Sequence, residues 1–302
     1  MKYCLSTIFA ILSLLPLGAF AQEGTTDSTP TATTETEKKA DTEKKSEPEK
    51  KAEPAKAEES SLGLNAELQV SSAYVFRGLN VFQKTSQMNQ NMLLAPGVTW
   101  SVFETGITIG YWGAYQLTGD NRSLNTDVGL NLEQDLYVTY ERKISKKLSA
   151  TGTATLYILP FADKDVIGVS APTWFEPSLA VTYDLGVASV SLYASYFFGV
   201  QSEGGIRDTS YAYFNPYVSK SLSIKGKDVE LKAGYGYKQF KEGNSGASNV
   251  HDLLFQASVN FSFGSWYLKP GVAAAWTNIE GPDSTFSDGF VVWAWLTAGY
   301  SK

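Results

Sequence analysis

Residues 64–71 read Leu-Asn-Ala-Glu-Leu-Gln-Val-Ser, and this alternation of apolar and polar side chains recurs through the rest of the chain. Successive side chains of a β-strand point to opposite faces, so an alternation of period two predicts a strand between two different environments. About twelve such segments follow one another between Leu64 and Ser301. An apolar residue at every second position indicates one face in lipid and the other in water. The sequence therefore predicts an all-β fold, a transmembrane antiparallel up-and-down β-barrel of about twelve strands.

The connections between these segments also alternate, one short and one long. Short turns are predicted near Glu104, Ser145, Leu185 and Gly264, and a somewhat longer one over Ser223–Lys227. The long polar connections are Gly78–Gln87, Thr118–Leu130, Pro160–Thr173, Gln201–Asp208, Lys241–Val250 and Asn278–Ser287. Short periplasmic turns and longer extracellular loops are typical of outer-membrane barrels. Because the alternation starts with a long connection and the strand number is even, both chain ends are expected in the periplasm.

The first 21 residues have the form of a secretory signal peptide. Lys2 supplies a positive charge, Leu5–Leu17 is an apolar run, and Ala19-Phe20-Ala21 has the form of a cleavage site. The run is too short for a transmembrane helix. The single cysteine, Cys4, lies inside this segment, so the mature chain is expected to have no disulfide. Together with the barrel pattern, the signal predicts localisation in the cell outer membrane.

The next segment, residues 22–61, is rich in Thr, Glu, Lys, Ala and Pro and contains no aromatic residue. Such a composition cannot bury enough apolar area to offset its ordering entropy, so we interpret the segment as a disordered linker. The chain then divides into a signal peptide (1–21), the linker (22–61) and the barrel (62–302). The linker is either a solvated periplasmic spacer or a tether that contacts the cell wall or a partner through its Lys pairs.

Aromatic residues make up 13% of the chain and gather towards the ends of the segments. The first strand is expected to run on to Arg77, with Tyr74 and Phe76 on its lipid face. Rings with a polar handle prefer the level of the bilayer interface. We expect Trp100, Phe103, Tyr140, Tyr183, Trp266 and Tyr300 near the periplasmic interface, and Phe76, Tyr115, Phe198 and Trp276 near the outer one.

The polar face of each strand is expected to line the lumen of the barrel. The charged candidates on this face are Glu67, Arg77, Glu133, Asp135, Glu141, Glu230, Lys232, Lys238, Asp252 and Lys269. Rings of one sign select ions, whereas a mixture indicates weak selectivity or internal salt bridges. Arg77 stands out because it precedes Gly78, which can turn the chain. It is either a charge at an outer constriction or a structural partner of a nearby carboxylate, and we favour the structural pair.

The stretch Ser72-Ala73-Tyr74-Val75-Phe76-Arg77-Gly78 resembles the Ser-x-Tyr-x-Phe-Arg-Gly opening strand of the TorF-like porins, a group of bacterial barrels. Gly110-Tyr111-Trp112-Gly113 is similar to the second hairpin of the same family. The resemblance covers roughly the first fifty residues after the linker. It implies a porin-like outer-membrane protein and brings no catalytic residues.

This sequence offers few residues that could act in catalysis or bind a metal ion. The single histidine, His251, stands beside Asp252, but adjacent strand residues point to opposite faces, so this Asp cannot orient that His as in a catalytic triad. Pairs of acidic-loop residues could hold Ca²⁺ through oxygen atoms, although without EF-hand spacing; they are Asp163 with Asp165 and Asp120 with Asn121. We therefore expect no enzyme activity, no metal site and no cofactor.

The expected function is that of a porin-like channel or binding barrel for small solutes, without chemistry, in contact with outer-membrane lipid. One alternative is a structural envelope protein that is anchored by its barrel and contacts the cell wall through its linker. A second alternative is a barrel-type outer-membrane hydrolase. The chain carries a net charge of -6, and the lack of a basic excess argues against nucleic acid as a partner.

Overall fold

The structure, a computed structural model, describes residues 62–80, 92–117, 133–160, 170–201, 210–240, 250–278 and 289–302. Within these ranges, no helix is long and apolar enough to cross a membrane. The strands are β1 (Leu64–Ser71), β2 (Val75–Phe76), β3 (Leu79–Asn80), β4 (Leu93–Val102), β5 (Ile107–Gln116), β6 (Glu133–Lys143), β7 (Leu148–Ile158), β8 (Thr173–Asp184), β9 (Ser189–Gly199), β10 (Tyr211–Ile224), β11 (Lys227–Phe240), β12 (Val250–Phe263), β13 (Trp266–Thr277) and β14 (Phe290–Ser301).

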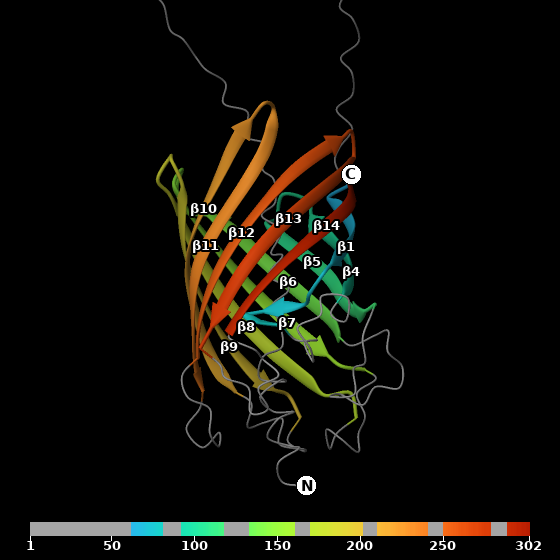
Figure 1. Ribbon diagram of the computed structural model, residues 1–302, viewed down its shortest axis with the longest axis vertical. Coiled ribbons are helices and arrows are strands. Elements are labelled where there is room, and N and C mark those ends of the chain that lie inside the picture. The colour runs from blue at the N-terminus through green and yellow to red at the C-terminus, as the bar shows by residue number, and fades with distance from the viewer. Residues whose placement is uncertain are drawn as a thin grey trace, which may run out of the picture.

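Twelve of these strands form one closed antiparallel barrel, which confirms the predicted fold (Figure 1). The barrel strands follow one another around the wall in chain order from β1 through β4 to β14, and β14 pairs with β1 to close the sheet. In this closure Leu68 pairs with Pro96 on one side and with Ala298 on the other. Because every barrel strand has two partners, the described barrel presents no open sheet edge.

The outside of the barrel is apolar all the way round. Large apolar residues are exposed at alternate positions of most strands, for example Leu68 on β1, Leu136 on β6, Leu192 on β9 and Val292 on β14, with exposures of 46%, 49%, 63% and 57%. The residues between them face the lumen, as the alternation predicts. An apolar outer band around a polar interior is the arrangement of a transmembrane barrel, and we assign the protein to the outer membrane on this basis.

The short turns gather at one end of the barrel, which we call the turn end. The turn between β10 and β11 contains only Lys225 and Gly226, so it is tighter than predicted, and Ser223 and Lys227 lie inside strands. Both turn residues have positive φ angles, 52° and 73°, which is the backbone of a type I′ turn that matches the right-handed twist of a hairpin. Lys302 also lies at this end, where its N–H donates to the carbonyl of Leu64.

We call the opposite end the loop end. Most residues of the six predicted long connections lie outside the described residues. The acidic pairs, Asp163 with Asp165 and Asp120 with Asn121, lie outside them as well. The predicted signal peptide and the predicted linker lie outside the described residues as well.

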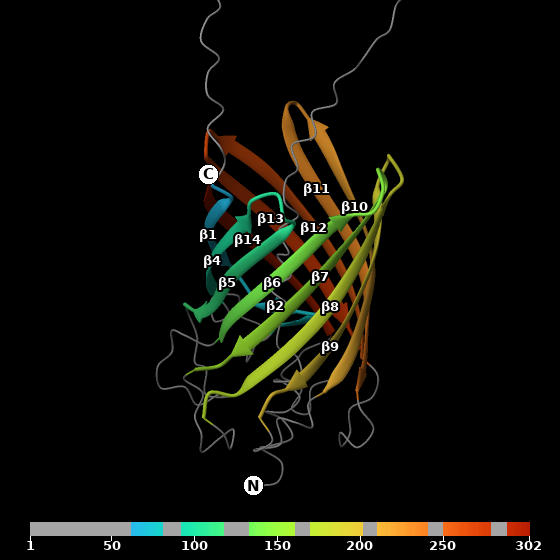
Figure 2. The ribbon, with the colours of Figure 1, turned by 180° about the vertical axis from the view of Figure 1, so that it is seen from behind.

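The first strand is shorter than predicted, because β1 ends at Ser71 and the chain then turns into the barrel (Figure 2). Residues 72–80, the inward segment, form a small hairpin in which Val75 pairs with Asn80 and Phe76 with Leu79. Its turn is Arg77-Gly78, with φ angles of 43° and 84°. This left-handed backbone reverses the chain between β2 and β3, and a Cβ on Gly78 would come within 2.7 Å of the Cβ of Asp252 on β12.

Two predicted side-chain positions are wrong because the chain leaves the barrel wall after Ser71. Tyr74 and Phe76 are 3% and 1% exposed inside the barrel, and neither lies on the lipid face. Phe76 is therefore not part of an outer aromatic belt. The alternation continues through these residues, but the environment of the apolar positions changes from lipid to the packed interior once the chain leaves the wall.

Candidate functional site

The inward segment fills the lumen near the loop end. Its Ala73 packs in an apolar cluster with Ala273 and Ala275 of β13 and with Trp293 and Trp295 of β14. These two tryptophans point inward, so they contribute apolar area to the interior and none to the lipid face. Burial of this area holds the start of the inward segment against one side of the barrel wall.

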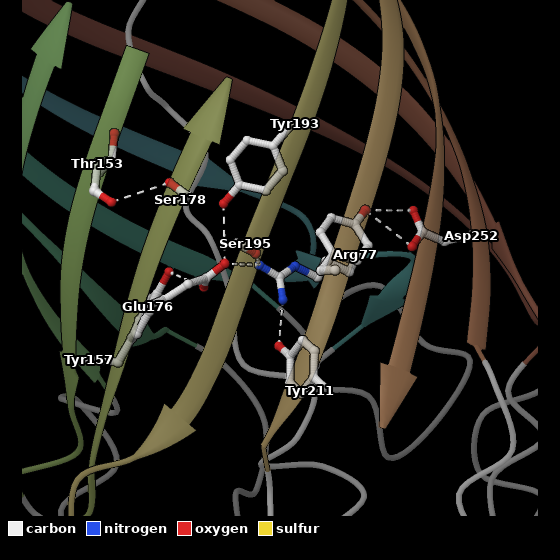
Figure 3. A network of polar contacts seen from close by, with 10 residues as sticks. Arg77, Thr153, Tyr157, Glu176, Ser178, Tyr193, Ser195, Tyr211 and Asp252 are labelled. Carbon is white, nitrogen blue, oxygen red and sulfur yellow. Dashed lines mark hydrogen bonds and ion pairs between the residues drawn. The ribbon is translucent and has the colours of Figure 1, made fainter. Parts of the chain in front are cut away.

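Arg77 holds the tip of the inward segment against the opposite side of the wall (Figure 3). Its guanidinium forms an ion pair with Glu176 of β8 and donates a hydrogen bond of 2.6 Å to the hydroxyl of Tyr211. Glu176 accepts two further hydrogen bonds, one of 2.9 Å from Tyr157 and one of 3.2 Å from Tyr193. The favoured sequence interpretation, a structural pair between Arg77 and a carboxylate, agrees with this geometry.

Aromatic rings complete the surroundings of Arg77. The guanidinium carbon lies 4.1 Å from the ring centre of Tyr213 and 4.5 Å from that of Phe76. The side chains of Arg77 and Glu176 are only 3% and 1% exposed. A buried pair of this kind is costly to break, because removal of one partner leaves the other charge uncompensated.

Two more groups of buried polar side chains surround the inward segment. On one side Tyr74 donates a hydrogen bond of 2.8 Å to Glu133, which lies beside Asp135 on the inner face of β6. On the other side the Nζ of Lys238 lies 5.2 Å from the ring centre of Phe76. Asp252 neighbours Lys238 on the inner wall because its strand partner is Gly236. The inward segment is therefore fixed to the wall by ionic and polar contacts on several strands.

Between the inward segment and the turn end lies a cavity of about 1110 Å³, which we call the vestibule. Its lining extends from Tyr74 and Phe76 of the inward segment to the turn residues Gly186 and Gly264. Hydroxyl, amide and charged side chains make up much of the wall, so the vestibule is a polar space inside an apolar shell.

Charges of both signs line the vestibule, and several have partners within the wall. The Nζ of Lys269 lies 2.6 Å from the Oε2 of Glu230. Lys232 places its Nζ 4.0 Å from the ring centre of Tyr217. This arrangement agrees with the predicted mixture of signs and internal salt bridges, and it gives no ring of a single sign among the described residues.

The ten predicted lumen residues fall into three groups. Those that line the vestibule are Glu67, Arg77, Asp135, Glu230, Lys232, Asp252 and Lys269. Glu133 and Lys238 also lie inside the barrel, but both are fully buried. Glu141 is exposed on the part of β6 that approaches the turn end and does not belong to the vestibule lining.

Residues 55–294 match the model of a family described as bacterial proteins of unknown function and designated Gcw_chp. The chain belongs to this family. No curated protein matches the chain. The family description names no activity, so the function of this Gcw_chp protein has to be argued from its own residues.

Several solved structures are similar to the barrel at low sequence identity. The KdgM porin in complex with disordered oligogalacturonate has a TM-score of 0.46 and 9% identity, with 79% of this chain and 98% of that chain covered. The COG4313 outer-membrane channel from Pseudomonas putida F1 has a TM-score of 0.47 and 10% identity, with 83% and 100% covered. LpxR from Salmonella typhimurium has a TM-score of 0.44 and 8% identity, with 78% and 99% covered.

Asp252 and His251 lie on opposite faces of the Gcw_chp barrel, as the alternation predicts. Asp252 is 1% exposed on the inside, where it accepts hydrogen bonds of 3.3 Å from Tyr213. His251 is on the outer face and shares a hydrogen bond with the hydroxyl of Tyr235. Among the described residues, no group of three or more His, Cys, Asp or Glu side chains could hold a metal ion.

Sequence reasoning missed Glu176 and the aromatic lining of the lumen. Glu176 lies between Phe175 and the outward Leu179 at an inward position of β8, so the alternation could have identified it as a lumen candidate. Trp293 and Trp295 also occupy inward positions, but an inward tryptophan has the same sequence signature as a lipid-facing one. The alternation alone therefore could not assign these aromatic residues to the interior.

Proposed function

We propose that this protein is an outer-membrane channel or binding barrel for small polar solutes, and that it performs no chemistry on them. The observation that carries the proposal is the vestibule, a polar cavity of about 1110 Å³ inside a closed barrel with an apolar exterior. The inward segment closes the lumen towards the loop end in this conformation. The resemblance to TorF-like porins agrees with this function.

The proposal includes an orientation. The turn end faces the periplasm and the loop end faces the outside, because outer-membrane barrels have short periplasmic turns. Residues 1–21 then direct export, and residues 22–61 form a periplasmic linker to the barrel. A solute that enters from outside meets the inward segment before it reaches the vestibule.

Liposome swelling with solutes of graded size tests the proposal. Proteoliposomes that contain the native protein should admit arabinose slowly, because the Arg77–Glu176 pair holds the inward segment in the lumen. The double substitution Arg77→Met with Glu176→Gln removes both charges at similar side-chain volume, and it should increase the swelling rate. The rate should fall again as the solute grows from arabinose to raffinose.

His251→Ala serves as the matched control, since His251 lies on the outer face and should not affect passage. If arabinose enters neither with the native protein nor with the double variant, although both proteins are folded, the channel is refuted. A role in anchoring the envelope would then remain. Hydrolysis of lipid or peptide by the purified protein that is lost in His251→Ala would instead favour the enzyme alternative.

A further inference from the structure

Three aromatic rings on the inner wall of the vestibule each lie across a glycine of the neighbouring strand. In every case the aromatic residue and the glycine are direct partners in the strand register, and the ring atoms occupy the space where a Cβ of the glycine would stand. The pairs are Tyr137 of β6 with Gly110 of β5, Trp295 of β14 with Gly271 of β13, and Tyr267 of β13 with Gly299 of β14.

A glycine partner lets the ring lie along the backbone instead of standing away from the wall. One ring face then covers the strand. For Tyr137 and Tyr267 the other face is directed to the vestibule, which both residues line, whereas Trp295 reaches the vestibule only at its edge because it packs in the apolar cluster with Ala73. Such pairs stabilise a sheet by covering the glycine backbone. They also provide flat apolar surfaces inside a wet cavity, and these surfaces suit a ligand that is itself flat and apolar on one side.

One part of the wall supplies hydrogen-bonding groups without charge. Hydroxyl side chains on three consecutive strands line the vestibule; they are Thr139 of β6, Thr151, Thr153 and Thr155 of β7, and Ser178 of β8. A hydroxyl group both donates and accepts hydrogen bonds, so a wall of hydroxyls can adapt to a ligand that carries many hydroxyls of its own.

The charged side chains of the vestibule are arranged in a way that does not favour an ionic ligand. Lys269 is paired with Glu230, and Glu67 accepts a hydrogen bond of 2.9 Å from the hydroxyl of Tyr267. With the signs mixed and partly paired, an anion or a cation gains little net attraction. A polar but uncharged ligand can still exchange hydrogen bonds with these groups, because each carries more than one hydrogen-bonding position.

We infer that the vestibule binds a neutral carbohydrate, which stacks the apolar face of its sugar rings on Tyr137 and Tyr267 and directs its hydroxyls to the hydroxyl side chains of β6, β7 and β8. A cavity of 1110 Å³ has room for a short oligosaccharide, since pockets for a single drug-sized ligand measure about 300–1,000 Å³. The inference rests on the proposed function in one respect, that a solute reaches the lumen.

Calorimetric titration of the full-length protein tests the inference. The protein is kept in lauryldimethylamine oxide, because maltoside and glucoside detergents carry sugar head groups that would compete. The probes are maltotriose, cellotriose and xylotriose, with trigalacturonate as an anionic sugar of equal length. At least one neutral trisaccharide should bind saturably and more tightly than trigalacturonate. If none of the three binds, or if trigalacturonate binds best, the inference is wrong.

Substitutions then assign the binding to the rings. Tyr137→Ala and Tyr267→Ala should each weaken binding about tenfold, the effect expected when one stacked ring is lost. Tyr267→Phe keeps the ring and loses only its hydrogen bond to Glu67, so its effect should be smaller. Tyr183→Ala is the matched control, because Tyr183 is 46% exposed on the lipid face and should leave binding unchanged.

Folding of each variant is checked by its heat-dependent shift in SDS gels. Should an alanine variant not fold, Tyr137→Leu retains apolar volume without a flat ring and must also lose affinity. Unchanged affinity in folded ring variants overturns the inference. If arabinose crosses the barrel but no neutral trisaccharide binds, the carbohydrate inference fails and the channel stands. If a trisaccharide binds but no variant passes any solute, the channel fails and carbohydrate binding stands.

Discussion

At the scale of single residues, the main contact between the inward segment and the barrel wall is the ion pair between Arg77 and Glu176. Both side chains are nearly inaccessible to solvent, and the pair connects the inward segment to a strand 99 residues away. Charges this deeply buried stabilise a structure only while both partners are present. The pair therefore defines one position of the inward segment.

We expect Arg77→Ala to lower the free energy of unfolding by about 3–5 kcal/mol, because Glu176 is then left charged and uncompensated in the interior. The double variant Arg77→Met with Glu176→Gln should lower the free energy of unfolding clearly less, because it leaves no unpaired charge in the interior. Urea or guanidinium unfolding in detergent measures both values. Lys269→Ala, which breaks a pair that is 33% and 41% exposed, should cost no more than about 1 kcal/mol. Equal losses in Arg77→Ala and Lys269→Ala would contradict the role assigned to Arg77.

The sequence was sufficient to predict that Arg77 pairs with a carboxylate, but not that the partner is Glu176. The two residues meet only because residues 72–80 fold into the closed barrel, and the sequence near Arg77 does not determine which strand it reaches. Tyr74 and Phe76 were assigned to the wrong environment for a related reason. An apolar side chain at an alternate position satisfies the pattern equally well in lipid and in an aromatic interior.

At the scale of the strands, the alternation makes a quantitative prediction for β6. Leu136 is 49% exposed on the outside, whereas Thr139 lines the vestibule. Leu136→Arg should destabilise the barrel by about 2–4 kcal/mol if the residue lies near the bilayer midplane, since arginine is expensive there. Thr139→Arg should destabilise the barrel less, because the new arginine side chain extends into the water of the vestibule. Unfolding titrations in lipid vesicles compare the two.

If Thr139→Arg proves the more damaging of the two, the register of β6 is wrong by one residue, and every side chain of the strand would change face. The strands themselves could be predicted from sequence because lipid and water impose a strict period of two. The turns were predicted in position but not always in length. The positive φ angles of Lys225 and Gly226 allow a two-residue turn that composition alone does not distinguish from a longer one.

At the scale of the whole molecule, closure through β1 and β14 creates an interior whose contents are then decided by the inward segment. Barrel type and approximate strand number follow from the repeated pattern. The inward segment does not, because residues 72–77 read as the end of a strand but fold inside instead. The vestibule and its aromatic lining exist in their present form because the inward segment bounds them.

The conductance of single barrels in planar lipid bilayers tests this account most directly. The native protein is compared with a variant in which residues 73–80 are replaced by a Gly-Ser linker of equal length, after both have shown a heat-dependent gel shift. We predict that the native barrel remains mostly closed and that the variant shows stable open steps. A native barrel that conducts as well as the variant would contradict the claim that the inward segment closes the lumen.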